Sequence, residues 1–446
     1  MKDLTEGNVA RLILRFSAPM IIGNVFQQFY NLSDTIIVGH FIGKEGLGSV
    51  GASGPIIFTL ISLIIGIASG GTIIISQLYG ARNFSKLQYA INTLYIFIFL
   101  SSILIGLIGI IFSREIFSLL QLPIELMKNA ILYFRIYMIG LPIFFLFYTT
   151  SAVLNGLGDS KTPLYFLIFS TILNIILDIA FIVLFKIGIS GAAIATVVSE
   201  CVAFFLIIMY LNRFSSVVKI NIKNLNFNLT IFKKFIKIGL PSGIQHILVS
   251  FGMTIIQAFV NKFGTNIVAA YSAASRIDSI AMLPAMTLGN ALSIFTGQNI
   301  GAGKNDRIKK GLRATCKLSA LIAIVISAVV VFQSESLMKI FISKKETEVI
   351  YAGKEYLTII GSTYFLFSLM FALNGIIKGA GDTFISMLIT FISLWIIRVP
   401  LAYLLSIKYE YTGIWIATPI SWAFGTFITY AYYKTNKWQN KNIIKN

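Results

Sequence analysis

The sequence has few charged residues and few of the side chains that most enzymes use for chemistry. Only 12% of its 446 residues are charged, against roughly 25% in an ordinary soluble domain. There are two histidines and two cysteines, and both cysteines, Cys201 and Cys316, stand in apolar stretches. This scarcity argues against a disulfide framework and against a structural metal site. We therefore expect no cofactor.

Common catalytic motifs are also missing from the sequence. It has no Gly-x-Ser-x-Gly elbow and no histidine–carboxylate cluster with metal-ligand spacing. The stretch "GQNIGAGKND" resembles a phosphate-binding loop only superficially. Counting back from Lys304, Gln298 occupies the position of the first glycine, and Asn305 replaces the serine or threonine. The sequence therefore favours neither an enzyme nor the use of ATP.

Long hydrophobic runs fill most of the chain, and 57% of its residues are hydrophobic. Each run of roughly twenty residues is long enough to cross a hydrocarbon core of about 30 Å as a helix. The runs begin near Leu12, Val50, Leu87, Ala130, Pro163, Gly188, Ile231, Ile267, Gly311, Tyr351, Asp382 and Tyr411. We predict an all-α integral membrane protein with about twelve transmembrane helices. The first run is too long for the core of a signal peptide, and it contains Pro19 and Asp34.

The charge that is present is mostly positive and is unevenly placed. There are 36 Lys and Arg residues against 17 Asp and Glu, which gives a formal charge of +19. The basic residues gather in alternate loops, a pattern that predicts a multi-pass protein of the plasma or inner membrane with both termini cytoplasmic. Such loops suit contacts with anionic membrane lipids. Their placement makes nucleic acid a poor candidate partner.

The chain repeats itself after about 221 to 223 residues. "SAPMIIG" is followed later by "GLPSGIQ", "ISQLYGARN" by "FTGQNIGAGKN", and "NGLGDSKTP" by "IKGAGDTF". We predict an N-lobe at residues 1–212 with helices 1–6, a cytoplasmic linker at 213–232, and a C-lobe at 233–446 with helices 7–12. Six helices per copy make the repeat parallel, and two such lobes suit alternating access around a cleft. Twelve helices that form their own cleft need no partner, so we expect a functional monomer.

Polar residues mark one face of the first span. Asn24, Gln27, Asn31 and Asp34 follow at steps of three, four and three, and Tyr30 precedes Asp34 by one helical turn. A carboxylate inside a membrane span is expensive, so this face should lie against protein or water rather than lipid.

Two further spans repeat this geometry. Asn174 and Asp178 are four residues apart in one span, and Thr196 and Glu200 are four apart in the next. Neighbouring buried carboxylates cannot both ionise cheaply, so a common pocket could hold a proton or a sodium ion at Asp34 and Asp178. The alternative is that these side chains only hydrogen-bond neighbouring helices together. The seventh span has polar residues, including His246, but no carboxylate, which favours an ion site in the N-lobe.

The whole chain resembles the multidrug and toxic compound extrusion (MATE) family of bacterial and archaeal transporters. The resemblance is carried by "QFYNLSDTIIVGHFIG", "GSVGASGP", "NGLGDSKTP" and "KGAGDT", in this order and with the duplication intact. It implies antiport that is coupled to protons or sodium. It also implies a cation-coupling cluster of Asp34, Asp178, Asn174, Thr196 and Tyr30, with a hinge at Pro19.

The expected function is export of lipophilic, cationic small molecules in exchange for H⁺ or Na⁺. Aromatic faces attract organic cations, and the chain has 37 Phe, 19 Tyr and 4 Trp. The alternative is a flippase for a lipid-linked oligosaccharide or a lipid, which should place clustered Arg and Lys in the spans. Asp278 is either a cation contact in the cleft or a structural residue paired with another helix, for example through Arg398.

Overall fold

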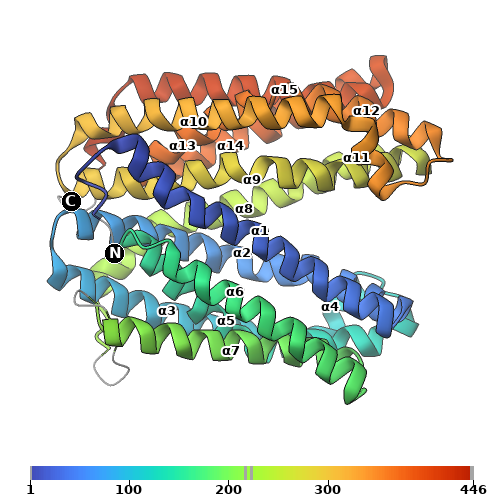
Figure 1. Ribbon diagram of the computed structural model, residues 1–446, viewed down its shortest axis with the longest axis horizontal. Helices are drawn as coiled ribbons and strands as arrows, with labels where there is room; N and C mark the ends of the chain where they lie inside the picture. Colours follow the sequence, from blue (N-terminus) through green and yellow to red (C-terminus); the bar gives the residue numbers. More distant parts are fainter. Residues whose placement is uncertain (1–2, 215–217, 221–224, 442–446) are drawn as a thin grey trace. The chain divides into compact units, whose positions relative to one another are not determined.

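The structure is a computed structural model that describes residues 3–214, 218–220 and 225–441. These residues are almost entirely helical and contain no strand (Figure 1). Parts of the predicted linker, residues 215–217 and 221–224, lie outside the described residues, as do both ends of the chain.

The helices of the first half match the predicted spans, with one short helix added between the third and the fourth. They are α1 (Val9–Phe41), α2 (Lys44–Gly80), α3 (Phe84–Ile111), α4 (Ser113–Leu119), α5 (Ile124–Gly156), α6 (Lys161–Asp178), the π-helical segment η1 (Ile179–Leu184) and α7 (Ile189–Phe214).

The second half repeats this order. It contains α8 (Leu229–Asn261), α9 (Thr265–Gly301), α10 (Asn305–Phe332), the short α11 (Ser334–Phe341), α12 (Thr347–Gly361), α13 (Tyr364–Gly379), α14 (Thr383–Phe391), a second π-helical segment η3 (Ile392–Arg398), α15 (Val399–Lys434) and η4 (Lys437–Asn440). The backbone repeats as well. Gly43 and Gly264, which precede α2 and α9, have φ angles of 83° and 86°, values that glycine adopts without strain.

The number of spans agrees with the prediction of twelve. Over the described residues, nine helices are long and apolar enough to cross a membrane, or up to eleven if each of two bent helix pairs is one span. One of the nine, Thr383–Lys434, has 52 residues. It is broken at Tyr409 and Glu410, which have non-helical backbone angles. At 1.5 Å per residue it exceeds twice a hydrocarbon core of about 30 Å, so we count it as two spans.

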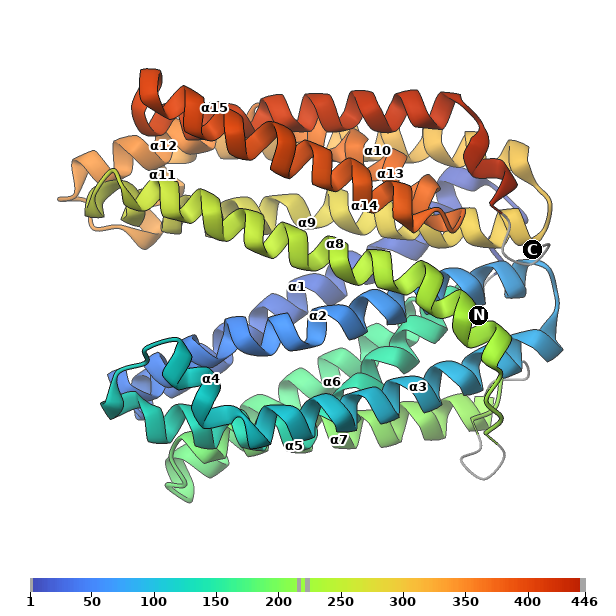
Figure 2. The ribbon, with the colours of Figure 1, turned by 180° about the vertical axis from the view of Figure 1, so that it is seen from behind.

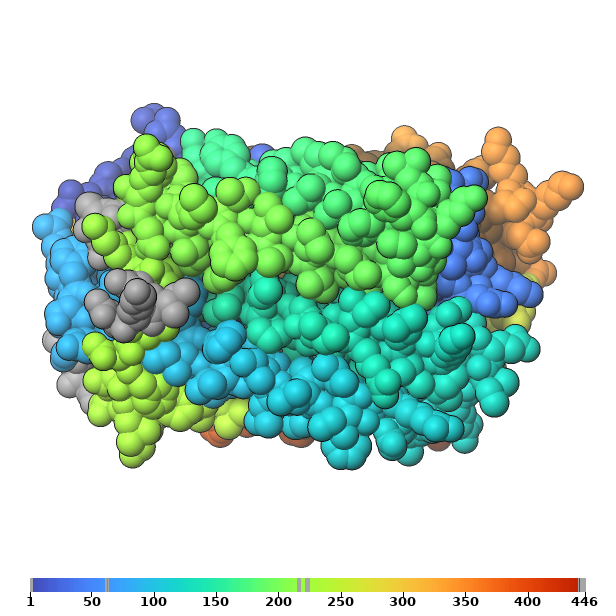
Figure 3. Space-filling model, turned by 90° about the horizontal axis from the view of Figure 1, so that it is seen from below, coloured from blue at the N-terminus to red at the C-terminus, as the bar shows by residue number. Residues whose placement is uncertain are grey.

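Large apolar side chains cover the outer face of several helices. Figure 3 looks onto a face of the first half that includes α3 and α7. On these helices Leu100, Leu104, Ile111, Phe205 and Met209 are all more than half exposed. A water-soluble protein rarely shows so large an apolar surface. The exposed apolar surface and the number of spans indicate a multi-pass membrane protein.

Contacts divide the chain into two compact units, and the chain crosses between them inside two helices. The first unit comprises Ala18–Gly243 with Asp3, and the second comprises Leu4–Ser17 with the chain from Ile244 onward. The crossings fall next to Pro19 in α1 and Pro241 in α8. Each of these helices therefore has one part in each unit. Figure 2 shows α8 on the near side as one continuous helix.

Within the first unit, α8 crosses α2 at a contact made by glycines. A Cβ atom on Gly66 of α2 would lie within 3.0 Å of the backbone of Gly243 on α8. One on Gly239 would come equally close to the Cα of Ile67. Gly66 and Gly70 are four residues apart, as are Gly239 and Gly243, and this spacing lets membrane helices approach to backbone contact. Pro241 lies between the two glycines of α8.

In the second unit, the "GQNIGAGKND" stretch binds the segment that precedes α1. The amide of Leu4 donates to Gln298 Oε1 at 3.0 Å, and Lys304 Nζ donates to the carbonyl of Thr5 at 3.0 Å. Arg307 donates to the carbonyls of Gly7 at 3.1 Å and Leu4 at 3.4 Å. Lys304 of this stretch and Arg307 directly after it thus hold backbone carbonyls of the segment that precedes α1.

Arg307→Lys should loosen this segment. Lysine lacks the planar fork that reaches the carbonyls of both Leu4 and Gly7. Losing about 1 kcal/mol of hydrogen bonding should speed amide exchange at Leu4 by roughly fivefold. Hydrogen–deuterium exchange of the N-terminal peptide measures the effect. Arg313→Lys, on the same helix, is the control, and equal exchange in both variants would contradict the role of Arg307.

Candidate functional site

The second part of α1 carries two polar side chains into the interior of the first unit. Tyr30 and Asp34 are 7% and 8% exposed, and they lie one helical turn apart on one face. Gln27 is partly buried and Asn31 is exposed, so these two predicted cavity residues do not enter the same buried cluster. Pro19 lies inside α1, which continues through it as a helix.

Helix α6 supplies the second pair. Asn174 and Asp178 are completely buried, and they share a face because they are four residues apart. Asp178 is the last residue of α6, and the π-helical segment η1 begins at Ile179. Short π-helical segments inside α-helices occur often at functional sites. The local backbone thus departs from regular helix directly beyond the carboxylate.

Helix α7 supplies Thr196 and Glu200, both buried. Asp34 and Asp178 lie close enough to interact electrostatically, and Tyr30 lies within the same range of Asp34 and Glu200 and beside Thr196. The residues predicted from three separate spans are therefore gathered in the first unit. Three carboxyl groups, one amide and two hydroxyl groups form what we call the N-lobe polar cluster: Tyr30, Asp34, Asn174, Asp178, Thr196 and Glu200.

Many buried polar atoms of this cluster have no hydrogen-bond partner among the described residues. They are Tyr30 Oη, Asp34 Oδ1, both side-chain polar atoms of Asn174, both carboxylate oxygens of Asp178, and Glu200 Oε2. A buried polar atom without a partner costs about 1–3 kcal/mol. So many in one place favour a site that binds a proton or a hard cation, for which carboxylate, amide and hydroxyl oxygens are suitable ligands.

Three neighbours of the cluster were not predicted from the sequence. Tyr133 and Tyr137 on α5 lie within electrostatic range of Asp34. Ser170 on α6 is completely buried and lies beside Glu200. The two tyrosines are four residues apart, but tyrosines in an apolar helix usually indicate packing. Only the fold shows that they lie near Asp34 of α1.

Asp278 belongs to the second unit and not to this cluster. Its carboxylate accepts a hydrogen bond from Tyr356 Oη on α12 at 3.2 Å. Among the described residues no ion pair joins it to Arg398, whose Nη1 instead donates to Met253 Sδ at 3.7 Å. Asp278 is thus bound by a tyrosine of another helix, which agrees with the structural reading, and Arg398 lies near enough to interact with it electrostatically without forming a direct ion pair among the described residues.

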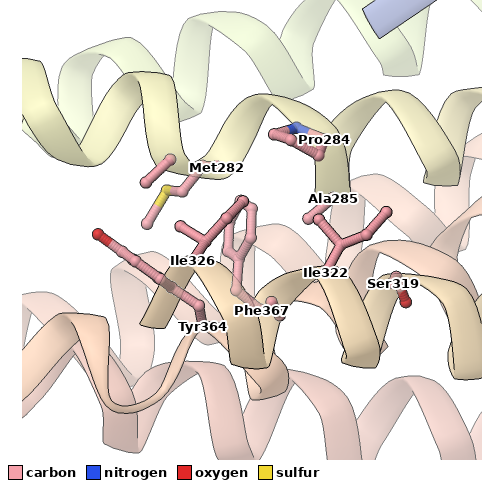
Figure 4. Close-up of a pocket in the computed structure, with 10 residues that line it drawn as sticks. Met282, Pro284, Ala285, Ser319, Ile322, Ile326, Tyr364 and Phe367 are labelled. Carbon is pink, nitrogen blue, oxygen red and sulfur yellow. The ribbon is translucent and has the colours of Figure 1, made fainter. Parts of the chain in front are cut away.

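A small pocket in the second unit is not a binding site for a large molecule. It lies between α9, α10 and α13, and Met282, Ile326, Tyr364 and Phe367 are among its lining residues (Figure 4). It offers about 10 Å³ to the centre of a water molecule, which is about the minimum for a single water.

Comparison with known proteins identifies the family. The family model described as MatE matches residues 19–180 and 241–404, which together make up most of the chain. The chain belongs to the MATE family. The two matched segments begin at Pro19 and Pro241, so the family match shows the same duplication as the sequence repeats.

Full-length relatives and solved structures agree with this membership. MATE proteins are membrane transporters. The chain is 32% identical to the probable multidrug resistance protein YoeA of Bacillus subtilis (strain 168), over 99% of this chain and 96% of that protein. It is 32% identical to YpnP of the same organism, over 98% and 97%. The fold matches an outward-facing multidrug resistance MATE family transporter of the MOP superfamily with a TM-score of 0.91 and 23% identity, over 97% of both chains.

Proposed function

We propose that this MATE transporter is a multidrug efflux antiporter that exports lipophilic cationic compounds in exchange for H⁺ or Na⁺. The observation that carries the proposal is the N-lobe polar cluster, in which Asp34 and Asp178 lie together with unpaired buried oxygens. The names of YoeA and YpnP, both called probable multidrug resistance proteins, support the substrate class. The protein acts in the plasma membrane, as a monomer, with both termini in the cytoplasm.

The proposed coupling works through α1. Asp34 lies on the part of α1 that belongs to the first unit, while the residues before Ala18 belong to the second. A proton or sodium ion at Asp34 and Asp178 removes the repulsion between the two carboxylates and pulls α1 toward α6 and α7. Pro19 lacks the backbone N–H that would stiffen this point of the helix, so α1 bends there. Binding thus favours one conformation of the transporter over the other.

Transport in proteoliposomes tests this function. A fluorescent lipophilic cation should move against its gradient when a pH gradient or a sodium gradient is imposed, and should stop when the gradient is dissipated. The gradient that works names the ion. Transport that proceeds equally without any ion gradient would sink the antiport proposal, and a dye that never moves would count against lipophilic cations as substrates.

A further inference from the structure

A second polar cluster lies within the second unit, where α8, α13 and α14 meet. Gln245 Nε2 on α8 donates to Thr390 Oγ1 on α14 at 2.6 Å. Ser386 Oγ, one turn earlier on α14, bonds Asn374 Oδ1 on α13 at 2.6 Å and reaches Gln245 Oε1 at 3.5 Å. These four side chains satisfy one another across three membrane helices.

Two basic side chains flank these four residues. His246 follows Gln245 directly, and Lys378 lies one turn after Asn374 on the same face of α13. The two are partly buried and lie close enough to interact electrostatically. Within the described residues, neither side chain makes an ion pair or a hydrogen bond. Asp382, the acid nearest to Lys378 in the sequence, accepts a hydrogen bond from Tyr432 and lies 3.8 Å from Lys441.

The duplication shows that the fold does not require these bases. By the repeat offset, His246 corresponds to Asn24, 222 residues earlier, and Lys378 corresponds to Asn155, 223 residues earlier. The first lobe therefore has neutral amides at both positions and its acids elsewhere. The second lobe has two bases, and its other buried charged residues, Asp278, Asp382 and Arg398, have the partners described above.

Helix electrostatics explains only part of this arrangement. Lys378 stands in the last turn of α13, where a cation interacts favourably with the helix dipole. An exposed lysine serves that purpose equally well, as Lys434 does in the last turn of α15. The dipole does not account for a second base beside Lys378 or for the hydrogen-bonding residues around both. A desolvated cation in a membrane protein usually pairs with an opposite charge.

We propose that His246 and Lys378 form a subsite that binds an anionic group, a carboxylate or a phosphate. The inference rests on the proposed function in one respect: the anion is carried by a transported compound. Lys378 supplies the charge, and the ring of His246 donates an N–H to the same oxygens. Asn374 and Gln245 orient the two bases by fixing the helix faces on which they stand. A transporter with this subsite accepts zwitterionic or acidic amphiphiles as well as simple cations.

A pair of matched dyes tests the subsite. Rhodamine 110 carries a free carboxylate, and rhodamine 123 is its methyl ester. Binding to purified protein in phosphatidylcholine nanodiscs is followed by fluorescence anisotropy. Lys378→Met should lower the affinity for rhodamine 110 by about tenfold or more, which is the usual contribution of a charge-assisted hydrogen bond. The affinity for rhodamine 123 should not change. Lys378→Arg should keep the native affinity for rhodamine 110. His246→Asn should lower the affinity for rhodamine 110 but not for rhodamine 123. Lys434→Met is the control and should change neither affinity.

Two further comparisons, with phosphatidylglycerol and with rhodamine 123, show whether the bound anion is a lipid phosphate and whether the proposal fails. Adding phosphatidylglycerol to the nanodiscs identifies a lipid phosphate as the anion if it displaces rhodamine 110 from the native protein but has no such effect on Lys378→Met. The proposal is overturned if Lys378→Met lowers the affinity for both dyes equally. It is also overturned if Lys378→Met changes neither the affinity for either dye nor the competition by phosphatidylglycerol. Gradient-driven export of rhodamine 123 tests the antiport function independently, so either proposal can fail alone.

Discussion

Asp34→Asn is expected to reduce gradient-driven efflux by up to roughly 150-fold, because conformational coupling typically amounts to about 1–3 kcal/mol. Asparagine has nearly the shape of aspartate, but it neither takes up a proton nor carries the charge that holds a sodium ion. The cluster around it should stay folded, since a neutral amide in this buried place costs less than an unpaired carboxylate. The loss should therefore appear in coupling rather than in stability.

Asp178→Asn should have the same effect, and the double variant should be no worse than either single change. The two carboxylates lie close enough to interact electrostatically. If they form one coupling site, as proposed, their effects should not add. The measurement is dye export from proteoliposomes under an imposed ion gradient, alongside dye binding, which should persist.

Asp278→Asn is the matched control for these carboxylates. It also removes a buried carboxylate, which Tyr356 binds, but in the second unit. Its export should remain coupled to the gradient. Undiminished coupled export in the Asp34→Asn, Asp178→Asn double variant would rule out the N-lobe polar cluster as the coupling site.

The spans and the predicted cluster could be read from the sequence because both follow from simple periodicities. A run of about twenty apolar residues must be a helix in lipid, and residues four apart share a face. Asp34, Asp178 and Glu200 could be grouped because a lone carboxylate in a membrane is costly, so three in one lobe suggest a shared pocket. These arguments need only one helix at a time.

Features that depend on neighbouring helices were out of reach. Tyr133 and Tyr137 have the same spacing as any packing pair, and only their nearness to Asp34 distinguishes them. Lys378 stands at the end of a span next to a loop, where lysine is ordinary, and its proximity to His246 follows from the packing of α13 against α14 and α8. The break at Tyr409 and Glu410 lies between two predicted spans, but the sequence does not show that the helices run together.

The passage of α1 and α8 from one unit to the other is a further example. Their apolar pattern continues through Pro19 and Pro241 without interruption, so the pattern alone does not reveal a change of partner. Glycine spacing is the one local signal. It marks where α8 touches α2, because only glycine permits such close approach.

Gly66→Val should therefore destabilise the first unit strongly. Its Cβ would lie within 3.0 Å of backbone atoms of Gly243 and Ser242, and backbone cannot rotate aside as a side chain can. The helices must separate, which loses contacts along the whole crossing. We expect a cost of about 3 kcal/mol or more, and a melting temperature lower by about 5 °C or more.

Gly51→Val is the matched control, because it places the same side chain on the same helix. A Cβ at Gly51 meets nothing within 4 Å, so the melting temperature should stay close to that of the native protein. Thermal unfolding in detergent compares the two variants. Because α8 reaches the second unit only beyond Gly243, separating it from α2 should also impair transport at temperatures where the protein remains folded. Equal melting temperatures for the two variants would mean that the α2–α8 crossing does not depend on glycine contact.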